Sequence, residues 1–161
     1  LYDTILKYKP EHCFEIGTYT GGGSTYFITS AFKKLGKGKL YTLESYPYLF
    51  KIAKRKYKFY LPRLTPYVKF ILGNTTKSFD KYIGSEVQCL FLDGDEDSRQ
   101  TIDQYYEFLP YFKSKAILMI HDWNTEKTVA IKPVLLNDPK WEKILELGQP
   151  ISVGFVVFKR K

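Results

Sequence analysis

Short apolar runs alternate with longer amphipathic segments along the chain, and this alternation predicts its secondary structure. Apolar runs rich in β-branched and aromatic side chains indicate strands, whereas apolar residues three or four positions apart indicate helices. The predicted strands are 13–16, 39–44, 68–72, 87–92, 116–120, 141–147 and 151–158. The predicted helices are 1–8, 25–35, one from Pro47 to about Pro62, 75–83, 98–112, and 126–136, which Pro133 shortens or kinks.

The order of these elements predicts an α/β fold. Strands that alternate strictly with helices form a parallel sheet with right-handed crossovers. The strands 87–92 and 116–120 are continuously apolar, which is typical of strands buried on both faces. The last two strands are joined by a very short connection and must be antiparallel. We therefore expect a single Rossmann-like, doubly wound sheet over residues 1–161, mostly parallel with an antiparallel C-terminal hairpin strand.

Composition and cysteine usage narrow the setting of the protein. The 161 residues are 44% hydrophobic, which indicates a globular domain with a substantial core. No apolar run approaches the roughly 20 residues that span a bilayer, and no signal peptide is apparent. Cys13 and Cys89 lie in apolar runs without metal-binding spacing, so we expect reduced core thiols. A cytoplasmic protein without membrane contact is the expectation.

The net charge of +8 admits nucleic acid, an anionic membrane surface or an acidic substrate as a partner. The densest basic run, 51–58, places lysines around a helical stripe of Phe50, Ile52, Ala53 and Tyr57. We expect this run to be a solvated helix face and not a specific nucleic-acid site.

The segment 15–24, EIGTYTGGGS, predicts a nucleoside-binding turn. It follows a short strand and opens a helix, and a helix N-terminus offers free N–H groups. Glycines let the backbone approach a ligand closely. A phosphate-binding P-loop would need lysine where Gly23 stands, and a dinucleotide fingerprint would need glycine where Tyr19 stands. The turn is therefore suited to a nucleoside but poorly suited to a polyphosphate.

Polar residues follow five of the predicted strands, where an open α/β sheet binds its ligands. These residues are Glu15 and Gly17, Glu44 and Ser45, Gly73 and Asn74, Asp93 and Asp95, and His121 and Asp122.

These motifs resemble the class I S-adenosylmethionine-dependent methyltransferases over nearly the whole chain. The turn resembles the first motif of that class, and Glu44 matches its ribose-binding acid. FLDGDED followed by ILMIHDW resembles small-molecule O-methyltransferases of the macrocin and cephalosporin-biosynthesis type. The resemblance implies that S-adenosylmethionine is the cofactor and that a small hydroxylated molecule, such as a sugar, is the acceptor. It also implies a bound Mg²⁺ held by Asp93 and the pair His121-Asp122.

The resemblance, together with the turn chemistry, gives three sets of candidate residues. The metal-binding set is Asp93, His121 and Asp122, and the catalytic set is Glu96 and His121 as candidate bases. The cofactor-binding set is Glu15, Gly17, Gly21, Gly22, Gly23, Ser24, Glu44 and Asn74.

Two positions depart from the family pattern. The family often has histidine where Glu96 stands and an acid where His121 stands. Because Mg²⁺ prefers oxygen ligands, either His121 is not a ligand, or the ion is another divalent metal, or no metal is bound.

Two alternatives to small-molecule methylation stay open. The charge and the stretch KYKFYLPRLTPYVKF favour an RNA or DNA methyltransferase, although the fourth strand ends in DGD rather than in a base-methylation turn. The departures at Glu96 and His121 favour a non-catalytic relative. The acceptor and a homo-oligomeric state are left undetermined by the sequence.

Overall fold

The structure is a computed structural model that describes residues 1–73, 76–84, 86–94, 97–148 and 152–161. It divides into two compact units, Leu1–Gly84 and Ser85–Lys161, and each unit is described by itself below. The prediction of a single domain over residues 1–161 stays a prediction.

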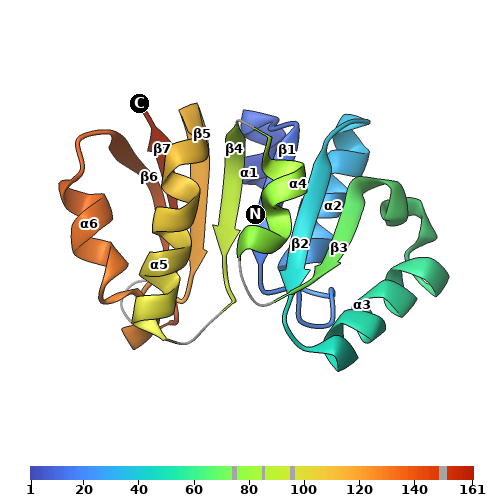
Figure 1. Ribbon diagram of the computed structural model, residues 1–161. Helices are drawn as coiled ribbons and strands as arrows, with labels where there is room; N and C mark the ends of the chain where they lie inside the picture. The colour runs from blue at the N-terminus through green and yellow to red at the C-terminus, as the bar shows by residue number, and fades with distance from the viewer. Residues whose placement is uncertain (74–75, 85, 95–96, 149–151) are drawn as a thin grey trace. The chain divides into compact units, whose positions relative to one another are not determined.

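The first unit contains three parallel strands in the order β3-β2-β1 and the helices that flank them (Figure 1). Its core contains Phe14, Phe32, Leu40 and Tyr57, all of which are buried. The elements are α1 (Tyr2–Tyr8), β1 (His12–Ile16), α2 (Ser24–Leu35), β2 (Lys39–Glu44), α3 (Pro47–Phe59), the 3₁₀ segment η1 (Pro62–Tyr67), β3 (Val68–Leu72), η2 (Thr76–Phe79) and α4 (Asp80–Ile83).

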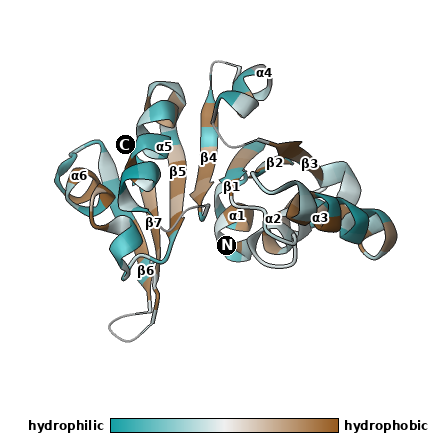
Figure 2. Cartoon of the chain, turned by 60° about the horizontal axis from the view of Figure 1, so that its bottom comes forward, coloured by the Kyte–Doolittle hydropathy of each residue, from teal (hydrophilic) through white to brown (hydrophobic). Residues whose placement is uncertain are grey.

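The second unit contains four strands in the order β4-β5-β7-β6. β4 and β5 are parallel, and β7 is antiparallel to both β5 and β6. β4 and β5 are largely apolar, whereas α5 carries many hydrophilic residues (Figure 2). The elements are β4 (Val87–Leu92), α5 (Ser98–Phe108), η3 (Leu109–Tyr111), β5 (Phe112–His121), η4 (Glu126–Thr128), α6 (Ile131–Asn137), β6 (Trp141–Leu147) and β7 (Phe155–Arg160).

The predicted fold class is confirmed. The seven strands have the order β3-β2-β1-β4-β5-β7-β6 in a mixed sheet with antiparallel β7. The strands 39–44, 68–72, 87–92 and 141–147 have the bounds that the hydrophobic pattern predicts.

The pattern misplaced several boundaries in the second unit. The helix predicted to reach Phe112 ends at Phe108, and β5 begins at Phe112, which pairs with Val87 of β4 ahead of an irregularity in the register. The segment 126–136 is not one helix: α6 begins only at Ile131, so the helix is shorter at its N-terminal end than predicted, and Pro133 stands near that start. It lies in the first turn of that helix, where a missing N–H removes no helical hydrogen bond. β7 begins at Phe155 rather than at 151.

Candidate functional site

The glycine turn of the first unit is anchored to the end of strand β2. The N–H groups of Gly17 and Thr18 both donate to the carbonyl oxygen of Leu43, at 3.0 and 3.1 Å. Gly17 and Gly21 have φ angles of 99° and 69°, which lie in the left-handed region that favours glycine. The turn thus continues β1 and is held by the carboxyl end of the neighbouring strand β2.

Gly21 is favoured both by its backbone conformation and by its close packing, whereas Gly22 faces the end of a flexible side chain. A Cβ at Gly21 would lie 3.2 Å from the ring of Tyr57, and a Cβ at Gly22 would lie 2.9 Å from Lys56 Nζ. At Gly23, which precedes α2, a Cβ would have no heavy atom of the described residues within 4 Å. The turn is therefore packed against α3 at its first glycines and open at its last.

Lys56 is a part of this turn that sequence reasoning missed. Its Nζ donates to Thr20 Oγ1 at 3.3 Å, so the turn does contain a cation, supplied by α3 rather than by the turn itself. The run 51–58 was predicted to be a solvated face. That holds for the exposed residues Lys51, Lys54 and Lys58, but Lys56 is half-buried.

Glu44 ends β2 with its side chain buried, at 5% exposure. Its Oε2 accepts the N–H of Tyr19 at 2.7 Å, and its Oε1 accepts the N–H of Tyr46 at 2.9 Å. Each oxygen has two lone pairs and keeps one for a further donor. The carboxylate is thereby fixed beside the turn, with acceptor capacity for two hydroxyl groups.

Glu15 lies beneath the turn rather than on its surface. Its side chain is fully buried, and Thr25 Oγ1 donates to Glu15 Oε2 at 2.7 Å. Because Thr25 belongs to the first turn of α2, this bond ties the end of β1 to the start of the helix. Glu15 therefore supports the turn, and Ser24, the first residue of α2, lies at its rim.

In the second unit, three predicted residues converge at the ends of β4 and β5. His121 Nδ1 lies 3.1 Å from Asp93 Oδ1 and 3.0 Å from Asp122 Oδ1. One ligand atom from each of the three residues lies within 4.8 Å of the others, which makes the group a possible metal site. The hydrogen bond that His121 donates to Asp93 raises the pKa of His121 above its ordinary value, and the negative charges of Asp93 and Asp122 add to this effect against desolvation.

A fourth residue, which the sequence did not single out, contacts both carboxylates of this cluster. Lys127 Nζ lies 3.2 Å from Asp93 Oδ1 and 3.3 Å from Asp122 Oδ2, and its side chain is 2% exposed. The ammonium group therefore bridges the two carboxylates that were predicted to hold a divalent ion. With this cation between them, the four side chains as folded do not fit a divalent metal, and the metal stays a prediction.

The loop that carries Lys127 is tied closely to its own unit. Asp122 has a φ of 57°, a conformation that aspartate tolerates better than most residues. Thr128 Oγ1 donates to the carbonyl of Trp123 at 2.8 Å, and the N–H of Asn124 donates to Val153 O at 2.8 Å. These bonds direct the chain after β5 so that Lys127 returns toward Asp122.

Two predicted site residues, Asn74 and Glu96, lie outside the described residues, and their roles stay predictions. Lys56 and Lys127 were missed because neither belongs to a strand-end motif. Lys56 stands in a run of similar lysines. For Lys127, the local sequence EKT gives no sign that its side chain is buried.

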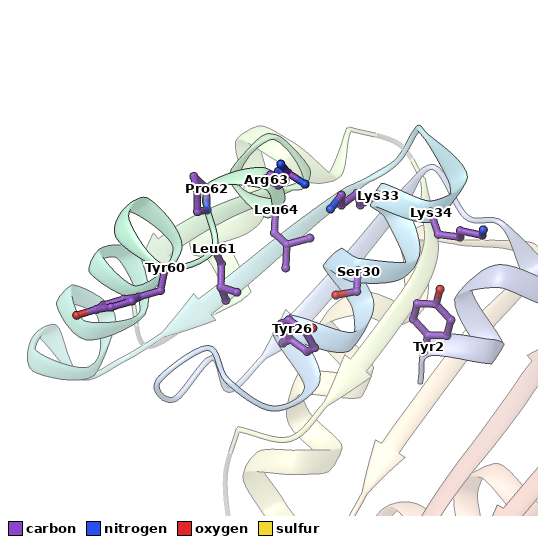
Figure 3. Close-up of a pocket in the computed structure, with 10 residues that line it drawn as sticks. All are labelled: Tyr2, Tyr26, Ser30, Lys33, Lys34, Tyr60, Leu61, Pro62, Arg63 and Leu64. Carbon is purple, nitrogen blue, oxygen red and sulfur yellow. The ribbon is translucent and has the colours of Figure 1, made fainter.

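A pocket of about 710 Å³ lies elsewhere in the first unit, between α1, α2 and the segment after α3 (Figure 3). Figure 3 shows the side chains of Lys33 and Arg63 pointing toward one another across it. None of the described residues that were predicted to bind the cofactor lines it. The lining residues are Tyr2, Tyr26, Ser30, Lys33, Lys34, Tyr60, Leu61, Pro62, Arg63 and Leu64.

The strand order and the turn beside Glu44 define a class I S-adenosylmethionine-dependent methyltransferase. The chain belongs to a family of methyltransferase domains, whose model matches residues 14–123. No curated protein matches the chain.

Solved structures with this fold cover nearly the whole chain. A putative caffeoyl-CoA O-methyltransferase from Staphylococcus aureus matches 99% of this chain and 80% of its own, with a TM-score of 0.79 and 16% identity. An O-methyltransferase from Bacillus cereus in complex with SAH matches 99% of this chain and 78% of its own, with a TM-score of 0.75 and 18% identity. A putative rRNA-methylase from Clostridium thermocellum matches 99% of this chain and 95% of its own, with a TM-score of 0.74 and 17% identity. At these identities the likeness shows the fold alone.

The comparisons thus confirm the predicted methyltransferase class. The finer resemblance to macrocin and cephalosporin-biosynthesis enzymes stays a prediction. Among the described residues, no helix is long and apolar enough to cross a membrane; the cytoplasmic setting stays a prediction, and the oligomeric state stays undetermined.

Proposed function

We propose that this protein transfers a methyl group from S-adenosylmethionine to a hydroxyl oxygen of a small hydroxylated metabolite, such as a sugar. The observation that carries the proposal is the carboxylate of Glu44, fixed by two backbone N–H groups beside an open glycine turn. Such a carboxylate suits the two hydroxyls of a ribose. Several solved structures of the same fold are described as O-methyltransferases, which supports transfer to oxygen.

The residues of the first unit bind and orient the cofactor in this proposal. S-adenosylmethionine supplies an electrophilic methyl group on a sulfonium ion, so the protein mainly aligns the partners. Glu44 accepts the ribose hydroxyls, Gly17 and the segment 21–24 allow close approach of the backbone, and Asn74 bonds the adenine edge. Lys56, the cation at the turn, pairs with the carboxylate of the cofactor's amino-acid moiety.

His121 is the proposed base of the second unit. A hydrogen bond from Nδ1–H to a carboxylate fixes the imidazole tautomer that keeps Nε2 free to accept a proton, and Asp93 and Asp122 both lie within reach of Nδ1. The side chain of His121 is 41% exposed, so an acceptor can reach it. His121 takes the hydroxyl proton as the acceptor oxygen gains the methyl group. Glu96 is the alternative base.

The experiment that tests the proposal is calorimetric titration of the full chain with S-adenosylhomocysteine, NAD and ATP. We expect saturable binding of S-adenosylhomocysteine alone. Binding of NAD or ATP, without binding of S-adenosylhomocysteine at millimolar concentration, would refute the cofactor assignment. Transfer of a ¹³C-labelled methyl group to sugars and catechols, followed by NMR, then tests the acceptor class.

The basic pocket favours nucleic acid as a second candidate substrate. It gathers Lys33, Lys34 and Arg63 with three tyrosines, and no acidic residue lines it. Cations beside aromatic rings suit a single strand, whose bases stack while its phosphates pair. Anisotropy of a short labelled RNA, measured across salt concentrations, tests this candidate. Tight binding at physiological salt that Lys33→Gln and Arg63→Gln weaken, while the exposed control Lys69→Gln does not, would favour it over a small-molecule acceptor.

A further inference from the structure

We propose that Lys127 is a built-in counter-ion that takes the place of a divalent metal between Asp93 and Asp122. The acidic cluster then positions His121 without a bound metal. This inference rests on the proposed function for the role of His121, but its central claim concerns metal binding and is tested without methyl transfer.

The cluster already contains the positive charge that its two carboxylates need. Two carboxylates this close repel each other, and a cation between them relieves the repulsion. Lys127 Nζ already lies within 3.3 Å of an oxygen on each carboxylate. His121, when protonated, adds a second positive charge, 3.1 and 3.0 Å from the same two residues. The cluster is therefore neutral or carries one negative charge before any ion is added.

The space between the two carboxylates is taken by Lys127. Mg²⁺ requires near-octahedral oxygen ligands at about 2.0–2.1 Å and usually retains several waters. The ammonium group of Lys127 stands where such an ion would contact both Asp93 and Asp122. A divalent ion placed there would lie against a like charge, and the third group, His121, offers nitrogen rather than oxygen.

Lys127 cannot readily leave its place between the two carboxylates. Its side chain is 2% exposed, so withdrawing the ammonium requires the loop 122–128 to open. That loop is fixed by Thr128 Oγ1, which donates to Trp123 O at 2.8 Å, and by Trp123, which is itself buried. A buried ammonium also needs its anionic partners, because an isolated charge is costly in a protein interior. Lys127 and the two carboxylates thus hold each other in place.

The two carboxylates held in this way position the imidazole. Asp93 and Asp122 each point an oxygen at Nδ1 of His121, from the ends of β4 and β5. Lys127 contacts the same oxygen of Asp93 and the other oxygen of Asp122, so it acts on the base through the carboxylates. It is a positioning residue and not a catalytic one.

The test is calorimetric titration of Mg²⁺ and Mn²⁺ into the chelator-treated, dialysed full chain. The variants are Lys127→Met, which removes the charge, Lys127→Arg, which keeps it, and Lys140→Met as an exposed control. We expect wild type, Lys127→Arg and Lys140→Met to bind metal no more tightly than about 1 mM, which is about −4.1 kcal/mol. We expect Lys127→Met to bind Mn²⁺ at least about tenfold more tightly, because two unneutralised carboxylates then face each other.

Two results would overturn the inference. One is wild-type binding of Mg²⁺ or Mn²⁺ in the micromolar range that Asp93→Asn abolishes. The other is a folded Lys127→Met variant that gains no affinity for metal. If Lys127→Met does not fold, the wild-type and Asp93→Asn titrations decide alone: weak wild-type binding supports the inference, and tight binding refutes it. Failure of S-adenosylhomocysteine to bind would refute the proposed function and leave these readings intact.

Discussion

The glycine turn of the first unit and the acidic cluster of the second unit are built in different ways. The turn is a nearly continuous stretch, 15–24, whose shape comes from its own backbone and from hydrogen bonds to the neighbouring strand end. The cluster is an assembly of side chains from β4, β5 and the loop after β5, which only the folded unit brings together. A local backbone site can be recognised from a motif, whereas a side-chain site can contain a decisive member outside every motif.

This difference predicts that substitutions in the cluster impair catalysis and those in the turn impair cofactor binding. The largest expected effect is that of His121→Ala, because general-base catalysis contributes about 10²–10⁴-fold. Turnover of any acceptor that the wild type methylates should fall by this factor, with affinity for S-adenosylhomocysteine unchanged. His12→Ala, at the exposed start of β1, is the control. Full turnover by His121→Ala would make Glu96 the better candidate base.

The cluster should also matter more for stability than a surface ion pair does. Lys127→Met should lower the free energy of unfolding by about 3 kcal/mol, the low end for breaking a buried pair, since Asp93 and Asp122 stay partly solvated. Urea denaturation measures this loss, and Lys140→Met should change it by no more than about 0.5 kcal/mol. A loss as small as that of the control would mean that Lys127 and the carboxylates do not depend on each other.

The same contrast explains how much of the molecule the sequence revealed. The bounds of β2, β3, β4 and β6 follow from the apolar positions of the sequence, and the continuous apolar run of β4 matches its burial on both faces of the sheet. The convergence of Asp93, His121 and Asp122 also follows, since the carboxyl ends of adjacent parallel strands meet at one edge.

Residues whose roles depend on tertiary packing could not be found from the sequence. The residues next to Lys127 in the sequence are polar, and nothing in EKT distinguishes a buried lysine from an exposed one. Lys56 differs from its neighbours only by the side of α3 on which it lies, and that side is fixed by the packing of Ala53 and Tyr57. The start of β5 at Phe112 was missed for a related reason: Phe112 pairs with Val87 of β4 ahead of a register irregularity, and this pairing is set by the fold and not by the apolar run.

In the turn, Glu44→Ala should weaken binding of S-adenosylhomocysteine by about 1.5–3 kcal/mol, the range for hydrogen bonds to a charged group. The loss arises because the ribose hydroxyls then lack their acceptor and the N–H groups of Tyr19 and Tyr46 lose theirs. Calorimetric titration measures it, with the exposed Glu142→Ala as the control. Unchanged affinity would show that the ribose is held elsewhere.

Lys56→Gln should separate the two ends of the cofactor. We expect affinity for S-adenosylhomocysteine to fall by about 1 kcal/mol, because a partly exposed ion pair is worth little. Affinity for methylthioadenosine, which lacks the amino-acid carboxylate, should not change. Lys54→Gln, on the same helix but exposed, is the control. Equal losses for both ligands would mean that Lys56 supports the turn and does not pair with the carboxylate.

The smallest expected effect is a shift in the titration of His121, followed by NMR of the metal-free protein. The pKa of His121 should lie above its ordinary value of 6.5, chiefly through the hydrogen bond with Asp93. Asp93→Asn should lower this pKa, because the hydrogen bond and the negative charge at Asp93 are its main causes. Lys127→Met should raise it further, since the nearby ammonium opposes protonation.

The sign of the accompanying stability change follows from linkage. A folded-state pKa above the unfolded value means that the folded protein binds the proton more tightly. The stabilisation from His121 is therefore fully present below pH 6.5 and is lost as the pH rises through the folded pKa. Urea denaturation should show Asp93→Asn losing this part of the pH dependence. A His121 pKa below 6.5 in the metal-free protein would contradict the ion pairs that join it to Asp93 and Asp122. The second unit would then lack the side-chain cluster that distinguishes it from the glycine turn.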